Sequence, residues 1–440
     1  MEDTPTPVPT RARQVGENQA RWAWVEPSVW TDRMLAALEK GVKGGTWFSL
    51  IDKVYAMGNL RSAWTSVKRN GGSAGVDHQT IEAFETHLEA NLEHLSASLR
   101  DGTYRPSAIR RVYIPKPGKK EKRPLGIPTV RDRVAQGALR HVLEPIFERD
   151  FAQHSYGFRP NRGCKDALRQ VDRLLDSGQT WVVDADLKSY FDTIPHRRLM
   201  DQIEEKVADG RVLRMIETYL HQDVMDGVQQ WTPDEGTPQG AVLSPLLSNI
   251  YLDKLDHHMA QAGIQMVRYA DDFVILCPSE REAREALERV RTWTAQAGLS
   301  LHPEKTRIVD ATQTGGFDFL GYHFERGYCW PASKSLGKFR DAIRAKTRRT
   351  NGQSLSQIIV AINRSLKGWF GYFKHSLPNT FSMLDGWIRM RLRSLLRRRC
   401  GRRGRGRGRD HQRWPNAFFA THGLFSTVTA YEEVRQSSCR

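Results

Sequence analysis

The spacing of apolar residues predicts helices in the first hundred residues. Between residues 81 and 99, apolar side chains recur at steps of three and four, which places them on one helical face. A shorter helix carrying Leu60, Trp64 and Val67 precedes it and ends at Asn70-Gly71-Gly72, a typical C-terminal signal. We expect these two helices to form a small packed layer rather than a binding site.

Short apolar runs predict strands further along the chain. Residues 110–115 and 123–128 are expected to form two strands joined by a lysine-rich turn. Such a turn is most often a solvated loop, but flanking strands would fix its cations in space, as phosphate binding requires. Residues 181–187 predict a buried strand that ends in Asp184 and Asp186. Carboxylates there are costly to bury unless paired or metal-bound, and spacing alone does not choose between them.

The tetrapeptide Tyr269-Ala270-Asp271-Asp272 lies between two apolar runs and is interpreted as a hairpin tip. Successive side chains of a strand point to opposite faces, so the two aspartates converge on one cation only if a turn breaks the alternation. Adjacent carboxylates repel each other, and Mg²⁺ held by carboxylates and substrate phosphates is a natural partner. Paired aspartates are also ordinary solvated turn formers, so the tetrapeptide alone leaves both interpretations open.

The later part of the chain is mainly helical in pattern. Helices are predicted at residues 131–147, 244–259 and 280–297, with a strand-like segment at 317–324. From about residue 336 the pattern is helical, with apolar stripes over 355–373 and 384–395. Arg389, Arg391 and Arg393 lie beside the second stripe, which is typical of a helix that packs on one side and meets phosphate on the other.

Composition favours a polyanionic partner. The chain of 440 residues has 67 Lys and Arg against 50 Asp and Glu, a formal net charge of +17, and nucleic acid is the commonest partner of such a chain. No apolar run approaches the roughly 18 residues of a membrane-spanning helix. The five cysteines are scattered and never form a C-x-x-C pair, which excludes a Cys₄ zinc module and fits a reducing cytoplasm.

Three irregular segments complete the pattern. The turn Ser155 to Pro160 presents an aromatic residue and the cation Arg159. The turn Gly236 to Gly240 opens a helix, a feature that cradles phosphate in some proteins but is usually just a tight turn. The Arg-Gly run over 401–409 is too polar to fold alone; it is common in RNA-binding segments and also in disordered, solubilising ones.

In chain order these features resemble one family. The chain is similar, from about Asn59 to its C-terminus, to the reverse transcriptases encoded by bacterial group II introns, which also serve as intron maturases. The motifs that carry the resemblance are Asn59-Leu60 with Gly75-Val76-Asp77, Arg123 to Pro128, Ser155 to Pro160, Asp186 to Asp192, Gly236 to Gly240, Tyr269 to Asp272, Phe319 to Tyr322, Lys367 to Phe373, and Trp414 to Phe419 with Gly423 to Ser426.

The resemblance implies an α+β fold of the right-hand polymerase type. It predicts a flexible leader over 1–45, a helical N-terminal extension over 46–105, and fingers and an antiparallel-sheet palm over 106–335. A helical thumb or maturase domain over 336–400 and an Arg/Gly-rich segment with a tail over 401–440 would follow. The family's longer members end in an H-N-H endonuclease with paired cysteines; this chain lacks that pattern, so intrinsic second-strand cleavage is not expected, and mobility would rely on host primers.

The resemblance also implies roles for individual residues. Asp186 and Asp271 would bridge two Mg²⁺ ions with support from Asp272, because nucleotidyl transfer uses two metals. Lys305 matches a cation near the leaving pyrophosphate. The residues that match nucleotide contacts are Lys116 and Arg123 for the triphosphate, Gln239 for the incoming nucleotide, and Phe191 for the aromatic that excludes a ribose 2′-hydroxyl. Arg159, Arg389, Arg391 and Arg393 would contact nucleic acid.

The expected function is therefore RNA-directed DNA synthesis from dNTPs on an RNA template and DNA primer, in the bacterial cytoplasm. Binding of a group II intron RNA, with help in its splicing and retrohoming, would accompany it. Two alternatives stay open. One is an RNA-binding splicing cofactor with a vestigial polymerase site. The other is a domesticated reverse transcriptase in phage defence, DNA repair or CRISPR adaptation.

Overall fold

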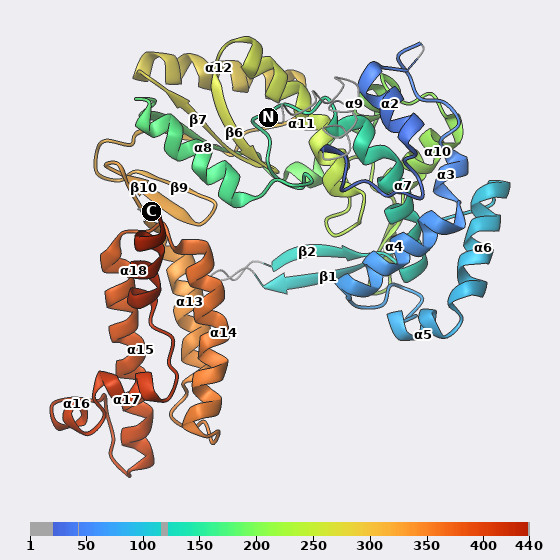
Figure 1. The fold of residues 1–440 in the computed structure, drawn as a ribbon. Coiled ribbons are helices and arrows are strands. Elements are labelled where there is room, and N and C mark those ends of the chain that lie inside the picture. The colour runs from blue at the N-terminus through green and yellow to red at the C-terminus, as the bar shows by residue number, and fades with distance from the viewer. Residues whose placement is uncertain (1–20, 43, 116–121, 439–440) are drawn as a thin grey trace, which may run out of the picture. The chain divides into compact units, whose positions relative to one another are not determined.

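The computed structural model describes residues 21–42, 44–115 and 122–438. The chain separates into two compact units (Figure 1). Of the described residues, the first unit contains 21–42, 44–115, 122–167, 185–275 and 284–306. The second contains residues 168–184, 276–283 and 307–438.

A helical layer opens the first unit. Its helices are α2 (Asp32–Lys40), α3 (Ile51–Val54), α4 (Met57–Asn70), α5 (Ile81–Thr86), α6 (Leu88–Asp101) and α7 (Val130–Glu148). The predicted helix over 81–99 is two helices, because His87 leaves helical geometry with φ −123° and separates α5 from α6. The apolar face is nevertheless buried as expected, and α4 ends at Gly71, whose N–H caps the carbonyl of Val67.

The flexible leader predicted for residues 1–45 differs from what is found over residues 21–42. Trp22, Trp30 and Leu38 are all buried, and Thr31 caps α2 by accepting a hydrogen bond from the N–H of Met34. The Trp30 indole N–H donates to the carbonyl of His141 at 2.9 Å, which ties this segment to α7. The tryptophans bury enough apolar surface to order a segment that its Pro- and Thr-rich beginning does not suggest.

Four strands form the first sheet of the first unit, in the order β2-β1-β4-β5. Strands β1 (Ile109–Pro115) and β2 (Lys122–Ile127) are antiparallel, as predicted, with Ile114 opposite Arg123. The lysine-rich turn between them, with Lys116, lies outside the described residues. Strands β4 (Val224–Asp226) and β5 (Gln229–Trp231) form a hairpin whose first strand runs parallel to β1.

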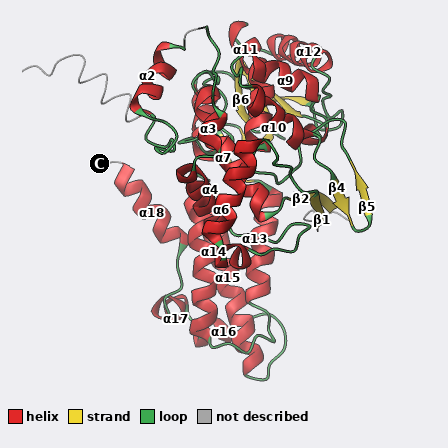
Figure 2. Cartoon of the chain, turned by 90° about the vertical axis from the view of Figure 1, so that its right-hand side faces the viewer, coloured by secondary structure: helices red, strands yellow, loops and turns green. Residues whose placement is uncertain are grey.

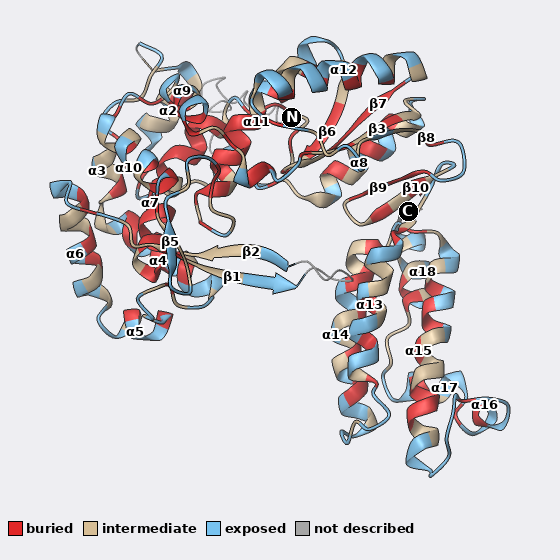
Figure 3. Ribbon diagram, turned by 180° about the vertical axis from the view of Figure 1, so that it is seen from behind, coloured by how far each residue is buried: buried red, intermediate tan, exposed pale blue. Residues whose placement is uncertain are grey.

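A second sheet has the order β6-β7-β3-β8 and provides the strand ends on which the acidic residues lie. Its strands are β3 (Trp181–Asp186), β6 (Gln265–Tyr269), β7 (Asp272–Cys277) and β8 (Arg307–Asp310), and β3 is antiparallel to β8. Helices of this region are α8 (Cys164–Asp176), α9 (His196–Glu204), α10 (Gly210–Leu220), α11 (Ser244–Gln261) and α12 (Glu280–Gln296), with the short 3₁₀ helix η1 (Tyr190–Asp192). Most residues of β6 and β7 are buried (Figure 3).

The second unit contains a small sheet and a helical bundle. The strands are β9 (Phe317–Phe319), β10 (Tyr322–Glu325) and β11 (Tyr328–Pro331), and the helices are α13 (Ser333–Lys346), α14 (Leu355–Phe373), α15 (Pro378–Arg399), α16 (Arg409–Arg413), α17 (Asn416–Thr421) and α18 (Thr427–Ser438). The segment predicted as one strand over 317–324 is a hairpin, because Leu320 and Gly321 take positive φ values of 48° and 84°. The predicted apolar faces of α14 and α15 are buried.

The Arg-Gly run that follows α15 is not isolated from the bundle. The Gly406 N–H donates to the Ser394 hydroxyl at 3.1 Å, and Arg397 forms an ion pair with Asp410 at 2.6 Å. A Cβ at Gly406 would lie 2.7 Å from that of Arg393, so the chain packs closely on α15. Helices and antiparallel sheets thus coexist as the α+β prediction requires (Figure 2). Among the described residues, we find no helix with the length and apolarity needed to span a membrane.

Candidate functional site

The Asp-Asp hairpin has the geometry predicted for it. Strand β6 ends at Tyr269, β7 begins at Asp272, and Ala270 between them takes a left-handed conformation with φ 60°. This conformation costs a non-glycine residue roughly 1–3 kcal/mol and persists where the surroundings enforce it. Because the turn breaks the alternation of the strand, Asp271 is placed in the loop while Asp272 opens β7.

The two candidate aspartates of β3 have different partners. In the second unit, Asp184 accepts a hydrogen bond from the Arg307 guanidinium at 3.1 Å, on the neighbouring strand β8. In the first unit, Asp186 is paired with the Lys305 ammonium, and its backbone carbonyl accepts a hydrogen bond from the His302 N–H at 2.7 Å. The ion pair with Arg307 distinguishes Asp184 from Asp186, a choice that sequence spacing leaves open.

Asp186 and Asp271 belong to one electrostatic group. Burial, and after it the negative charge of Asp186, raises the pKa of the Asp271 carboxyl above its ordinary value. The Asp271 backbone N–H and the cations Arg123 and Arg268 act in the opposite direction. Two carboxylates whose charges oppose each other in a partly buried site are stabilised by a cation between them.

Oxygen ligands of this kind suit Mg²⁺ rather than a soft metal. Asp186 keeps 31% of its side chain exposed and already attracts the Lys305 ammonium, which is an internal cation at the same carboxylate. Within the described residues, no three His, Cys, Asp or Glu side chains form a group able to hold a metal. The carboxylates of Asp186 and Asp271 fit a Mg²⁺ ion that takes one or two carboxylates and completes its shell with water and substrate phosphates.

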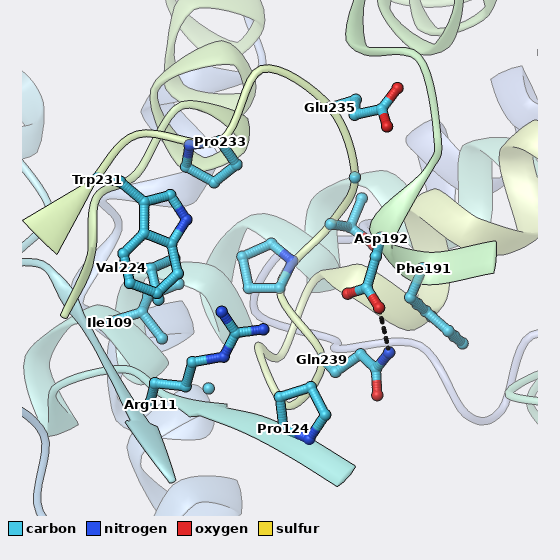
Figure 4. A pocket seen from close by; sticks show the side chains of 14 residues that line it. Ile109, Arg111, Pro124, Phe191, Asp192, Val224, Trp231, Pro233, Glu235 and Gln239 are labelled. Carbon is cyan, nitrogen blue, oxygen red and sulfur yellow. Dashed lines mark hydrogen bonds between the residues drawn. The ribbon is translucent and has the colours of Figure 1, made fainter. Parts of the chain in front are cut away.

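The Gln239 side chain is hydrogen-bonded to two charged residues, Arg123 and Asp192. The Arg123 Nε donates to the Gln239 side-chain oxygen at 2.9 Å, and the Gln239 amide nitrogen donates to Asp192 at 3.2 Å (Figure 4). The Gly126 N–H of β2 also donates to the backbone carbonyl of Gln239 at 2.6 Å. Arg123 and Gln239, predicted from separate motifs, are thus brought into direct contact.

The turn that carries Gln239 is packed against the segment that carries Phe191. The Thr237 N–H donates to the Phe191 carbonyl at 2.6 Å, and the Gly236 N–H donates to that of Ile194 at 2.8 Å. A Cβ at Gly236 would lie 2.7 Å from the Asp192 backbone, so this close approach requires glycine. The ring of Phe191 is 8% exposed and meets Tyr190 edge to face at 5.5 Å.

Behind these residues lies a pocket of about 190 Å³ that is lined by both predicted and unpredicted side chains (Figure 4). Phe191 and Gln239 line it together with Asp192, Arg111 and Trp231. The Arg111 guanidinium lies 5.1 Å from the Trp231 ring centre. Burial raises the pKa of Asp192, and the charge of Arg111 opposes that shift. No role was predicted for Asp192, Arg111 or Trp231, although Asp192 ends the motif over 186–192 and Arg111 lies in the strand predicted over 110–115.

Arg159, which is predicted to contact nucleic acid, is held by acceptors inside the first unit. Its side chain is 2% exposed and forms an ion pair with Glu148 at 2.8 Å. The guanidinium also donates to the carbonyls of Ala152 and Ser155, at 2.5 and 2.9 Å. These acceptors engage the guanidinium inside the fold, where it stabilises the turn over 155–160.

The three arginines of α15 are also engaged within the second unit. Arg393 is buried and donates to the Trp414 carbonyl and the Asn416 side chain. Arg391 donates to the Thr347 hydroxyl at 2.7 Å, and Arg389 lies 3.7 Å from Asp385. The chain that follows α15 thus covers the part of the helix that carries Arg393.

Comparison with known sequences assigns both parts of the chain. Residues 114–324 match the family described as reverse transcriptase (RNA-dependent DNA polymerase), and residues 336–414 match the maturase-specific domain of group II introns. Protein YkfC of Escherichia coli K12 is 32% identical over 346 residues, which cover 70% of this chain and 86% of that protein.

The group II intron-encoded protein LtrA of Lactococcus lactis is 36% identical over 230 residues. That match covers 52% of this chain but only 37% of LtrA. Among solved structures, a partial Cas6-RT-Cas1–Cas2 complex aligns with 56% of this chain and 41% of that one, at 25% identity and a TM-score of 0.37, too low to support an argument. The sequence matches decide the matter: the chain belongs to the reverse transcriptase family and also carries the maturase-specific domain of group II introns.

Proposed function

We propose that the chain polymerises DNA on an RNA template through Asp186 and Asp271, and that it binds a group II intron RNA and assists its splicing. The observation that supports this most is the mutual repulsion of the Asp186 and Asp271 carboxylates inside the region that matches reverse transcriptases. Two bound Mg²⁺ ions would activate the primer 3′-hydroxyl and neutralise the leaving phosphates. Asp186 and Asp271 would hold them, with Asp272 contributing from the start of β7.

The surrounding residues would position the nucleotide. Arg123, together with Lys116, would take the triphosphate of a dNTP, since guanidinium groups bind phosphate oxygens through paired hydrogen bonds. Gln239 would contact the nucleotide while Asp192 fixes the orientation of its amide. Lys305 would leave Asp186 for the pyrophosphate, where an ammonium offsets the departing charge. Phe191 would lie under the sugar and exclude a 2′-hydroxyl.

RNA binding by the second unit would use a cation cluster that shares only Arg391 with the three arginines predicted on α15. Arg340 and Arg344 of α13 and Arg391 of α15 lie 5.7–5.9 Å from the ring centre of Trp387. The Arg340 Nε is buried and has no hydrogen-bond partner in the described structure. Three like charges around one indole favour a polyanion, and phosphate oxygens supply several acceptors at once. We call this set the Trp387 cluster.

The Trp387 cluster is testable through salt dependence. Replacing Arg340 and Arg344 with alanine should weaken intron RNA binding and reduce the slope of log affinity against log salt by about one for each lost phosphate contact. Arg291→Ala, at an exposed ion pair with Glu288 in the first unit, is the matched control. An unchanged slope in the double variant would remove the cluster from the RNA interface.

A second candidate is a splicing cofactor that no longer polymerises. The observation that favours it is the Lys305 ammonium on Asp186, which occupies a carboxylate that catalysis requires. The two candidates share the bacterial cytoplasm and an intron RNA, but only the first needs a DNA primer and dNTPs. For both candidate functions we propose the same domain boundaries, at residues 45, 105, 335 and 400. They separate the leader, the N-terminal extension, the fingers and palm, the thumb or maturase domain, and the tail.

Primer extension separates the two candidates. The purified protein with an RNA template, a DNA primer, dNTPs and Mg²⁺ should extend the primer, and Asp271→Asn should reduce the rate by about a thousandfold, as the loss of several kcal/mol of metal-borne stabilisation requires. RNA binding and splicing should persist in that variant. Asp184→Asn is the matched control, because Asp184 lies on the same strand as Asp186, two residues earlier, but pairs with Arg307. A wild-type protein that promotes splicing without extending primers would favour the cofactor.

A further inference from the structure

The residue before the Asp-Asp turn is a buried arginine. We propose that Arg268, held by Asp256 and Asn249 of α11, is a positioning residue that fixes the orientation of the Asp271 carboxylate through the carbonyl of Ala270. The inference rests on the proposed function in one respect, which is the role of Asp271 in holding Mg²⁺. It adds three residues that lie outside the motifs used to recognise the site.

The guanidinium of Arg268 is saturated by contacts within the first unit. Its side chain is 1% exposed and that of Asp256 is fully buried. The Nε donates to Asp256 at 2.7 Å, and one terminal nitrogen forms a short hydrogen bond with the same carboxylate. The other terminal nitrogen donates to the Asn249 side-chain oxygen at 3.0 Å and to the Ala270 carbonyl at 2.8 Å.

The last of these contacts reaches the candidate catalytic residue. The Ala270 carbonyl and the Asp271 N–H belong to one planar peptide unit, so fixing the oxygen also fixes the direction of the N–H. The Asp271 Cα, which carries the carboxylate side chain, is bonded to that N–H group, so the same peptide plane also sets the direction in which the side chain leaves the turn. A hydrogen bond from Arg268 to Ala270 therefore restrains the carboxylate as well as the left-handed backbone of Ala270.

A second set of contacts holds the same turn from the segment over 154–157. The Asn249 amide nitrogen donates to the Gly157 carbonyl at 2.8 Å, and the Arg268 N–H donates to the His154 carbonyl at 2.9 Å. A Cβ at Gly157 would lie 2.2 Å from the Ala270 nitrogen, so the two backbones are in direct contact. Asn249 thus connects the guanidinium to the segment on which Ala270 packs.

Stability alone does not explain a buried ion pair at this place. Removing two charges from water costs several kcal/mol per ion, and an apolar pair of similar volume is often as stable or more stable. An apolar pair, however, provides no donor for the Ala270 carbonyl. The rigid fork of arginine supplies donors to three acceptors at once, which a single lysine nitrogen does not reproduce.

The test replaces the ion pair with the apolar pair Arg268→Met and Asp256→Leu in the full chain. We expect a folded protein whose kcat for primer extension falls about 10- to 100-fold, the usual effect of losing a group that orients a metal ligand. The KM for dNTP should stay within about twofold, because uniform substrate binding is untouched. Mn²⁺ alone, titrated by electron paramagnetic resonance without nucleic acid, should bind about tenfold more weakly.

Two further variants keep the result decisive. Arg268→Lys retains the charge opposite Asp256 and should reproduce the losses in kcat and Mn²⁺ affinity if the double variant does not fold. Arg133→Lys is the control, since Arg133 is another buried arginine of the first unit that holds backbone carbonyls, of Pro128 and Ser73, away from the Asp-Asp turn. It should keep the wild-type kcat and Mn²⁺ affinity.

The outcomes separate this inference from the proposed function. Folded Arg268 variants with wild-type kcat and Mn²⁺ affinity would overturn the inference while leaving reverse transcription intact. A wild-type protein that extends no primer would contradict the proposed function, and the Mn²⁺ titration would still decide whether Arg268 positions Asp271.

Discussion

Two tight hairpins of this chain use the same backbone device for different ends. The β6–β7 turn has Ala270 at φ 60°, and its carbonyl accepts a hydrogen bond from Arg268. The β9–β10 turn has Leu320 at φ 48°, and its carbonyl accepts a hydrogen bond from the Tyr372 hydroxyl at 2.7 Å. Each strained turn is thus held by a side-chain donor. Only the first turn is followed by a pair of carboxylates. A strained turn that is held by a side-chain hydrogen bond therefore does not by itself indicate a catalytic site.

The most direct test of the difference between the two turns is to add a methyl group at a glycine close to each of them. Gly157→Ala places a Cβ where the Ala270 nitrogen lies, at 2.2 Å, and must displace the first turn. We expect primer extension to fall about a hundredfold, the usual cost of a misplacement near 1 Å. The measurement is kcat in single-nucleotide extension.

The matched change in the second hairpin is Gly321→Ala. Its Cβ would meet the Ser335 hydroxyl at 2.9 Å, and the residue has φ 84°. We expect a loss of about 1–2 kcal/mol of stability from the left-handed backbone, with kcat unchanged for the folded protein. Equal losses of kcat in both variants would contradict the distinction between the turns.

The next largest effect is expected at Phe191, which is proposed to lie under the sugar of the incoming nucleotide. Phe191→Val should allow ribonucleotides to be incorporated, lowering the preference for dNTPs by about 10- to 100-fold, the range that one steric contact supplies. Single-nucleotide extension with dNTP and rNTP in parallel measures it. Unchanged discrimination would show that Phe191, with its ring 8% exposed, acts only in packing.

A smaller effect is expected at the clamp of the second turn. Tyr372→Phe leaves the Leu320 carbonyl without this donor and should cost about 1–2 kcal/mol, which thermal unfolding detects as a shift of a few degrees. Catalysis should not change, because the hairpin carries no proposed active-site residue. A fall in kcat without a fall in melting temperature would show that the two turns are not functionally distinct.

The smallest effects are expected when each strained residue becomes glycine. Ala270→Gly and Leu320→Gly both relieve backbone strain and both increase the entropy of the unfolded chain, so the net stability change should stay within about 1 kcal/mol. Chemical denaturation measures it. A larger loss in Leu320→Gly than in Ala270→Gly would reflect the larger side chain removed.

The sequence predicts helices and strands better than it predicts which arginine side chains are engaged within the fold. Period and turn residues predicted the paired strands β1 and β2 and the helices α7, α11, α12, α14 and α15, because local geometry and burial agree there. The hairpin at Leu320 was missed, since a leucine with positive φ has no local signal. The engagement of Arg159 and Arg393 was not predicted, because their acceptors are carbonyls and side chains that only folding brings to them.

The candidate site shows the same limit. Asp186, Phe191, Gln239 and the Asp-Asp turn were identified by motif order, and the structure brings Gln239 into contact with Arg123. Asp192 is linked to Gln239 by a hydrogen bond between residues that lie 47 positions apart in the sequence. Arg268 acts as a buried charge. Neither has a spacing rule, and Lys116 lies outside the described residues.

The ion pair between Lys305 and Asp186 has a practical consequence for handling the protein. A carboxylate that already has an internal cation does not depend on dissolved metal to offset its charge, and more than half of the Lys305 side chain faces solvent. Purification in a chelating buffer should therefore leave the melting temperature unchanged. Activity should return as soon as Mg²⁺, a template and a primer are supplied, with no refolding delay.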